Sequence, residues 1–212
     1  MDSHPLISLY SKDYKKNSQS SIQAAHPLIL IVGREPSDTG SFENIPGPYD
    51  FDWAKRCAFW NESYAVVSKV AGMRDGQHLK DQCRKNNLSP IAFTDISPVL
   101  IENRDPLKHE KRREITEDQI EKHIDNVVQL NEQIGRTTVV LLTGHRTGSL
   151  SKQERRIFDI GATKLEEALT LQNTPHISVP FMFGNNQSSI LNAIHGNEAV
   201  CSRIQDAVKA AA

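Results

Sequence analysis

Four short polar segments hold the residues of this chain with the clearest capacity for chemistry. Each comes directly after an apolar run: residues 33–37 (GREPS), 94–98 (TDISP), 144–148 (GHRTG) and 184–189 (GNNQSS). In the first segment Glu35 precedes Pro36, which stiffens the turn. A carboxylate held in this way can orient a water molecule and take its proton. We therefore predict a catalytic role for Glu35, the alternative being a solvated turn glutamate paired with Arg34.

The other three segments offer groups that bind ligands. Asp95 either caps nearby backbone amides or accepts hydrogen bonds from a ligand. His145 and Arg146 follow the third apolar run, where an arginine can hold a phosphate in bidentate fashion. Asn185 and Asn186 present amides to a ligand, or simply form a turn that favours asparagine.

Two further features suggest nucleic acid. The basic stretch 108–113 (KHEKRR) is either a solvated face or a set of contacts to backbone phosphates. The long segment after the first apolar run is rich in Gly and Pro and contains the aromatic residues Phe42, Tyr49 and Phe51. These rings either stack on a base or seal the segment against the core.

The elements that must position these segments alternate between strands and helices. Apolar runs predict buried strands at 28–32, 90–96, 137–143 and 176–183. Helical spacing predicts helices at 53–70, 77–85, 116–134 and 151–169, and one or two more within 190–211, with a charged loop at 102–114. This order predicts an α/β fold with three layers, α/β/α, around a central, mainly parallel four-stranded sheet. The four polar segments would then meet at the carboxyl edge, where open α/β folds bind ligands.

Composition limits the class of protein. The 212 residues predict a polar N-terminal arm at 1–25 and a single domain at 26–212. A net charge of −1 excludes a globally basic binder but not a local basic patch. The cysteines, Cys57, Cys83 and Cys201, are too far apart for a zinc or iron–sulfur site. No apolar run approaches the roughly 20 residues that cross a bilayer. We expect a cytoplasmic monomer with no membrane partner, no metal and no cofactor.

The motifs resemble those of the uracil-DNA glycosylase superfamily. In that family an apolar strand leads into Gly-x-(Asp/Asn/Ala)-Pro, and this chain has GREP at 33–36. A second strand leads into Thr-Asn-x-x-Pro, and this chain has TDISP at 94–98, with Asp95 in the Asn position. The last family motif is commonly His-Pro-Ser, and the matching segment here, 184–189, has no histidine. The resemblance covers the order of elements over most of 27–196, but these short motifs carry it.

The resemblance implies a DNA glycosylase that flips a nucleotide out of the duplex and hydrolyses its N-glycosidic bond, without a Schiff base or a metal. Glu35 occupies the position of the water-activating residue, and Asn185 lies where the family has its histidine. The residues implied for the base pocket are Gly33, Arg34, Pro36, Tyr49, Phe51, Phe59, Asp95 and Asn186. Those implied for DNA contact are His145, Arg146, Ser188, Ser189, Lys111, Arg112 and Arg113.

The aspartate at position 95 bears on the choice of base. An amide both donates and accepts, which suits uracil, whereas an ionised carboxylate only accepts and suits the exocyclic amine of a cytosine. Some members of the resembled superfamily excise bulky modified pyrimidines from phage DNA. With Asp95 and Asn185 in the pocket, the resemblance therefore implies excision of a modified pyrimidine, such as glucosylated hydroxymethylcytosine, as part of antiviral defence. Three alternatives stay open: repair of uracil or other deaminated bases, hydrolysis of free nucleosides or nucleotides, and non-catalytic binding of modified or abasic DNA.

Overall fold

The structure is a computed structural model that describes most of the chain between Pro27 and Ala211. The described residues are 27–34, 37–38, 58–86, 89–98, 101–102, 106–135, 137–144, 150–180, 182 and 184–211. The predicted arm at 1–25 and the predicted helical residues 53–57 lie outside this part of the chain.

Four parallel strands form the central sheet, in the order β3-β1-β5-β6. They are β1 (Leu28–Gly33), β3 (Ile91–Asp95), β5 (Thr137–Thr143) and β6 (His176–Val179). All six residues of β1 are buried, because a parallel strand inside the sheet is covered on both faces. The predicted α/β fold with three layers is confirmed.

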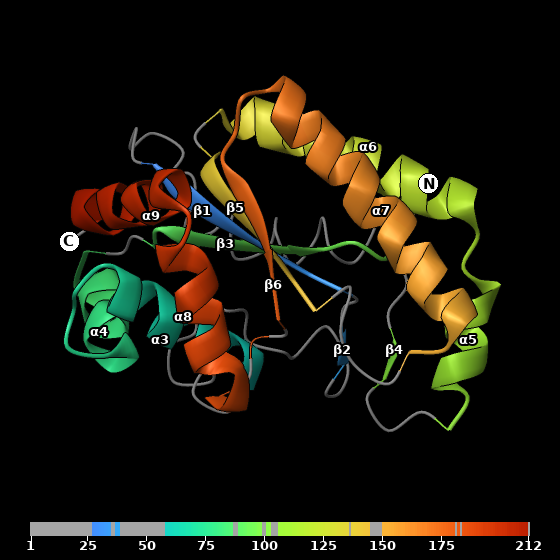
Figure 1. Cartoon of the computed structure of the whole chain (residues 1–212), viewed down its shortest axis with the longest axis horizontal. Helices are drawn as coiled ribbons and strands as arrows, with labels where there is room; N and C mark the ends of the chain where they lie inside the picture. Colours follow the sequence, from blue (N-terminus) through green and yellow to red (C-terminus); the bar gives the residue numbers. More distant parts are fainter. Residues whose placement is uncertain are drawn as a thin grey trace.

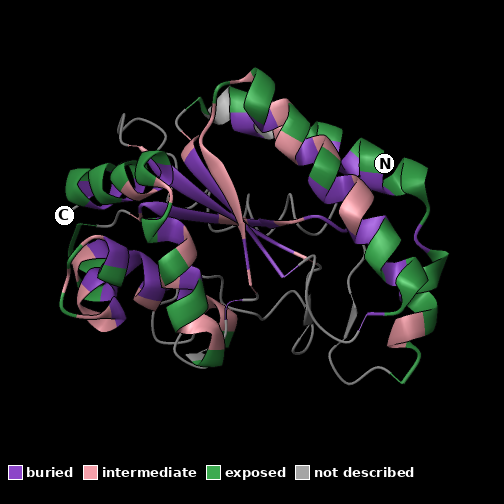
Figure 2. Ribbon diagram, in the orientation of Figure 1, coloured by how far each residue is buried: buried purple, intermediate pink, exposed green. Residues whose placement is uncertain are grey.

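Helices cover both faces of the sheet (Figure 1). One face packs against α3 (Ala58–Val70), α4 (Gly76–Asn86), α8 (Gln187–His195) and α9 (Glu198–Ala211), and the other against α6 (Glu117–Ile134) and α7 (Lys152–Leu171). Alternate residues of β1 feed the two cores: Ile29 and Ile31 face α3, whereas Leu30 and Val32 face α7. Figure 2 shows the result as buried strands between helices that are exposed only on their outer surfaces.

Capping residues fix the start of both helices on the α6/α7 face. Thr116 and Gln119 form a reciprocal capping box at α6, and Ser151 and Glu154 form another at α7. Helix α6 ends at Gly135, whose φ of 63° is a left-handed conformation that glycine adopts without strain. These local signals explain why both helices start within a residue of the predicted positions.

The prediction of a charged loop at 102–114 is wrong for residues 108–114, which form a helix. This helix is α5 (Lys108–Glu114), and β4 (Ile101–Glu102) pairs in parallel with β2 (Ser37–Asp38) just before it. The sequence of α5 contains no apolar residue, so hydrophobic periodicity cannot reveal it. A second correction concerns β6, which ends at Val179 rather than at 183 because Pro180 has no N–H to donate to the ladder.

Candidate site at the carboxyl edge of the sheet

The carboxyl ends of the four strands lie along one edge of the sheet. Gly33 of β1 is the register partner of Asp95 of β3, and on the other side of β1, Val32 pairs with Leu142 of β5. Strand β3 thus lies on one side of β1, whereas the later strand β5 lies on the other. The point between β1 and β5 where the strand order reverses is the place where open α/β sheets bind ligands.

The Asp95 carboxylate lies directly over the backbone of Gly33. A Cβ atom on residue 33 would lie 2.1 Å from Asp95 Oδ1 and 3.7 Å from Cζ of the Phe59 ring. Only glycine lets the carboxylate take this position. The structure therefore brings together three residues predicted for the base pocket, from β1, β3 and α3. We refer to them as the Gly33–Asp95–Phe59 cluster.

Packing within the α3 layer orients the aromatic member of this cluster. The Phe59 ring meets Phe93 edge to face, with 6.1 Å between ring centroids and 60° between planes. Ser63 Oγ donates a hydrogen bond of 2.8 Å to the Phe59 carbonyl one turn back along α3. Of the aromatic residues predicted to stack on a base, Phe59 is thus beside Asp95, whereas Tyr49 and Phe51 lie outside the described residues.

The backbone of Asp95 is fixed from the opposite layer. His123 of α6, only 3 % exposed, donates from Nε2 to the Asp95 carbonyl at 2.9 Å. The sequence analysis missed this residue, although its spacing from Ile120, Ile124 and Val127 places it on the buried face of α6. Beyond Asp95, Ile96 N donates to Gly33 O at 3.0 Å and so keeps the two strand ends together.

Arg34 points away from this cluster. Its guanidinium carbon lies 5.6 Å from the centroid of the Phe158 ring on α7, which belongs to the core of the other face. Its carbonyl accepts a 2.9 Å hydrogen bond from Ser97 N. The structure thus does not bring the Arg34 side chain together with Asp95 and Phe59 in a base pocket, and gives it a packing role under α7.

The last polar segment is attached to the same helix as Phe59. It comprises η2 (Gly184–Asn186) and the start of α8, which lies beside α3 (Figure 1). Gln187 Nε2 donates to Glu62, and Lys69 Nζ donates to Gln187 Oε1, both partners being on α3. The predicted residues of this segment remain accessible: Asn185, Ser188 and Ser189 are exposed and Asn186 is half-buried.

The basic stretch divides into buried and exposed residues. Arg112 is 8 % exposed, and its Nη1 lies 3.5 Å from Glu154 Oε1 of α7. A phosphate contact by Arg112 does not fit this burial, because the guanidinium pairs with a carboxylate inside the protein. Lys111 and Arg113, on the same helix, are exposed and remain candidates for DNA contact.

Glu154 is the electrostatic centre of the contact between α5 and α7. It is 1 % exposed and accepts from His109 Nδ1 at 2.9 Å and from Ser151 N at 2.7 Å. Burial alone would raise the pKa of this carboxyl, but the hydrogen bonds from Ser151 and His109 outweigh it and lower the pKa to about 2. The group is therefore ionised and structural at neutral pH.

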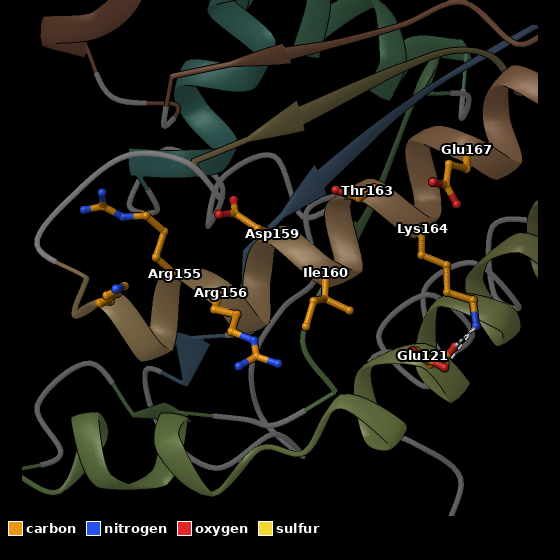
Figure 3. A pocket seen from close by; sticks show the side chains of 9 residues that line it. Glu121, Arg155, Arg156, Asp159, Ile160, Thr163, Lys164 and Glu167 are labelled. Atoms are coloured by element: carbon orange, nitrogen blue, oxygen red, sulfur yellow. Dashed lines mark hydrogen bonds and ion pairs between the residues drawn. The ribbon is translucent and has the colours of Figure 1, made fainter.

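An open pocket of about 760 Å³ lies elsewhere, on the outer side of α7 (Figure 3). Two of the cationic side chains that line it form ion pairs with α6. Lys164 Nζ lies 2.9 Å from Asp125, and Arg156 Nη2 lies 2.8 Å from Glu117. Because two of its cations, Lys164 and Arg156, pair with carboxylates of α6, this mixed-charge surface is a helix–helix seam rather than a base pocket. We therefore assign the candidate site to the sheet edge.

Several predicted residues lie outside the described part of the chain. They are Glu35, Pro36, Tyr49, Phe51, His145 and Arg146. Within that part, no group of three or more His, Cys, Asp and Glu side chains is arranged to hold a metal ion, and none of its helices is long and apolar enough to cross a membrane.

Comparisons with protein-family models, with curated proteins and with solved structures find no match for this chain. The functional argument therefore depends on the residues and their geometry.

Proposed function

We propose that this protein is a monofunctional DNA glycosylase, which hydrolyses the N-glycosidic bond of a flipped, modified pyrimidine and leaves an abasic site. The observation that carries the proposal is the Gly33–Asp95–Phe59 cluster beside the point where the strand order reverses. A carboxylate next to an aromatic ring supplies one partner for the edge of a planar base and another for its face.

The carboxylate favours a cytosine-type base. Ionised Asp95 accepts a hydrogen bond from the exocyclic amine of such a base. Uracil and thymine place a carbonyl oxygen at the same position, so two acceptors would face each other without a proton between them. Repulsion of this kind discriminates more strongly than a missing contact, because it leaves buried polar groups unpaired.

In the reaction, a water oxygen bonds to C1′ of the sugar while the bond from C1′ to the base nitrogen breaks. The electron pair of that bond leaves with the base, and Glu35 takes the proton of the water. Glu35 itself lies outside the described residues, but its neighbours support the assignment. Arg34 O is bonded to Ser97 N, and β2, which starts at Ser37, pairs with β4. Both neighbours thus contact the segment that follows Asp95.

The exposed polar residues around this edge suit the DNA backbone. Ser188 and Ser189 belong to the first turn of α8, where backbone N–H groups are directed outward and favour anions. Lys111 and Arg113 of α5 add exposed cationic side chains. Phosphate contacts of this kind position the duplex without reading its sequence, so the choice of base falls to the cluster.

The decisive experiment is a base-release assay. The wild-type protein is incubated with DNA containing glucosylated hydroxymethylcytosine, uracil or hypoxanthine, and strand cleavage after alkali and the mass of the released base are measured. We expect release of the modified cytosine, and its loss in Glu35→Gln with DNA binding retained. Asp95→Asn is the matched variant. Because an amide can both donate and accept, we expect this variant to release uracil in preference to the modified cytosine.

Four outcomes would contradict the proposal. Release of uracil alone by the wild-type protein would indicate repair of deaminated bases. Intact strands together with tight, salt-dependent DNA binding would indicate a non-catalytic binder. Cleavage of free nucleosides but not of DNA would indicate a nucleoside hydrolase. Unchanged turnover in Glu35→Gln would remove Glu35 from the mechanism.

A further inference from the structure

The hydroxyl group of Thr143, at the end of β5, is buried and has no hydrogen-bond partner among the described residues. Thr143 is 0 % exposed, and no group in the described part of the chain pairs with its Oγ1. Buried polar groups of folded proteins are nearly always paired, because an unpaired one loses its hydrogen bonds to water. Valine has almost the same shape, occupies positions 139 and 140 of this strand, and would avoid that loss. Within the described part of the chain the hydroxyl thus has no structural purpose, and a ligand could supply the missing partner.

Strand alternation places Thr143 on the same face of the sheet as the Gly33–Asp95–Phe59 cluster. Leu141 packs with Ile31 in the core on the α3 face, and Leu142 packs with Val32 in the core on the other face. Successive side chains alternate, so Thr143 faces α3 again. The glycine of the cluster obeys the same alternation, because Phe59 of α3 approaches it.

The register places Thr143 next to the cluster along the sheet edge. Val32 pairs with Leu142, so Gly33 lies beside Thr143, and Gly33 in turn pairs with Asp95. The edge on this face thus reads Asp95, Gly33, Thr143, with two strand spacings, or about 10 Å, between the outer Cα atoms. The central glycine has no side chain, and the Asp95 carboxylate leans across it towards Thr143.

The chain leaves the sheet directly after Thr143. The N–H of Gly144 still donates to Val179 O of β6 at 3.2 Å, but its φ of 77° departs from the extended conformation and ends the strand. Thr143 is therefore the last side chain of β5 at the point between β1 and β5 where the strand order reverses. Asp95 is half-buried, whereas Gly33 and Thr143 are buried, so Asp95 is the member of this row nearest to solvent.

We propose that Thr143 is a second base-reading residue, whose hydroxyl donates to N3 of an amino-pyrimidine while the exocyclic amine donates to Asp95. The inference rests on the proposed function and narrows its substrate to bases of the cytosine type. Such a base presents an amine donor and a neighbouring acceptor, N3, on one edge, and the carboxylate and hydroxyl supply the matching acceptor and donor. In thymine N3 carries a proton and cannot accept from the hydroxyl. Phe59 then covers the face of the ring.

The test combines binding with thermal unfolding for three variants. Thr143→Val removes the hydroxyl and keeps the shape, and Thr143→Ser keeps the hydroxyl. Thr137→Val is the matched control, because the Thr137 Oγ1 is also buried and unpaired among the described residues, at the amino end of the same strand. The probes are fluorescein-labelled oligonucleotides with one hydroxymethylcytosine or one thymine at the same position, and fluorescence anisotropy gives the ratio of their dissociation constants.

We expect Thr143→Val to reduce this ratio about tenfold, as the loss of one hydrogen bond does. Thr143→Ser and Thr137→Val should keep it. The thermal midpoint of Thr143→Val should equal or exceed that of the wild type, because the hydroxyl bonds to no group in the described part of the chain. A wild-type ratio in Thr143→Val would overturn the inference, as would a fall in its midpoint that Thr137→Val does not share.

The outcomes separate this inference from the proposed function. A wild-type protein that prefers hydroxymethylcytosine, depends on the Thr143 hydroxyl for that preference and yet releases no base would refute the glycosylase and support the reading role of Thr143. A wild-type protein that binds both probes equally would refute the reading role, whatever bases it releases.

Discussion

Replacing Gly33 by alanine should abolish base recognition while leaving the protein folded. The new Cβ atom would lie 2.1 Å from Asp95 Oδ1, whereas real Cβ atoms essentially never come closer than 3.0 Å to such a neighbour. The carboxylate must therefore move by about 1 Å or more. Groups that hold a substrate must stay within roughly 0.5 Å of the productive geometry, and a displacement of 1 Å can reduce the rate by about 100-fold.

The cost to stability should be small by comparison. Overpacking a filled core costs about 1–3 kcal/mol, because neighbouring side chains have no free space. Asp95 is half-buried, and the atom that the new Cβ meets, Oδ1, is the far end of its side chain, so we expect Gly33→Ala to lower the free energy of unfolding by no more than about 1 kcal/mol. The variant thus separates the position of the carboxylate from the integrity of the fold.

Gly161→Ala provides the matched control. Its Cβ atom would lie 2.5 Å from Cγ2 of Ile96 and 2.8 Å from Cγ2 of Ile120, both fully buried. This variant should lose about 1–3 kcal/mol of stability but retain base release per folded molecule. Urea unfolding and single-turnover base release are measured for both variants. The reasoning fails if Gly33→Ala releases base at the wild-type rate, or if it unfolds as readily as Gly161→Ala.

Two further predictions concern residues that support the site. The folded pKa of Glu154, about 2, is below its ordinary value of 4.5, so ionised Glu154 stabilises the fold above pH 4.5, and this stability is lost as the pH falls towards 2. This lowered pKa contributes about 3 kcal/mol to the free energy of unfolding. In urea titrations, the free energy of unfolding of Glu154→Gln should therefore fall less between pH 5 and pH 2 than that of the wild type. Replacing His123 by leucine removes the hydrogen bond to the Asp95 carbonyl. We expect the free energy of unfolding to fall by about 1–3 kcal/mol in the same titrations, and the hydroxymethylcytosine probe to bind more weakly. Unchanged values for both would show that this bond does not position Asp95.

The sheet could be predicted from the sequence because its strands are buried on both faces. Residues 137–143 form an uninterrupted apolar run apart from threonines at the ends, and the strand has those bounds. Helix α6 was equally visible from its capping residue and its apolar face. Helix α5 was not, because it attaches to α7 through Arg112, His109 and Glu154 instead of through apolar side chains.

The site was only partly predictable for a related reason. Parallel strands place their carboxyl ends at one edge, so the sequence could indicate that Gly33 and Asp95 are neighbours. It could not choose Phe59 among several aromatic residues, because that choice depends on how α3 packs against the sheet. It also assigned Arg34 to the base pocket, since spacing alone does not tell which face a side chain takes after a strand ends.

The proposed function raises an electrostatic problem, because DNA is a polyanion, the proposed base-reading residue Asp95 is a carboxylate, and the chain carries a net charge of −1. The buried Arg112–Glu154 pair helps to solve it. By fixing α5 against the first turn of α7, it gathers the exposed cations of both helices, Lys111, Arg113, Lys152 and Arg155, on neighbouring turns. DNA phosphates would meet these cations, whereas the Asp95 carboxylate meets only the flipped base. The basic stretch would therefore support the proposed DNA binding in two ways, through its exposed residues as contacts and through Arg112 as the residue that holds them in place.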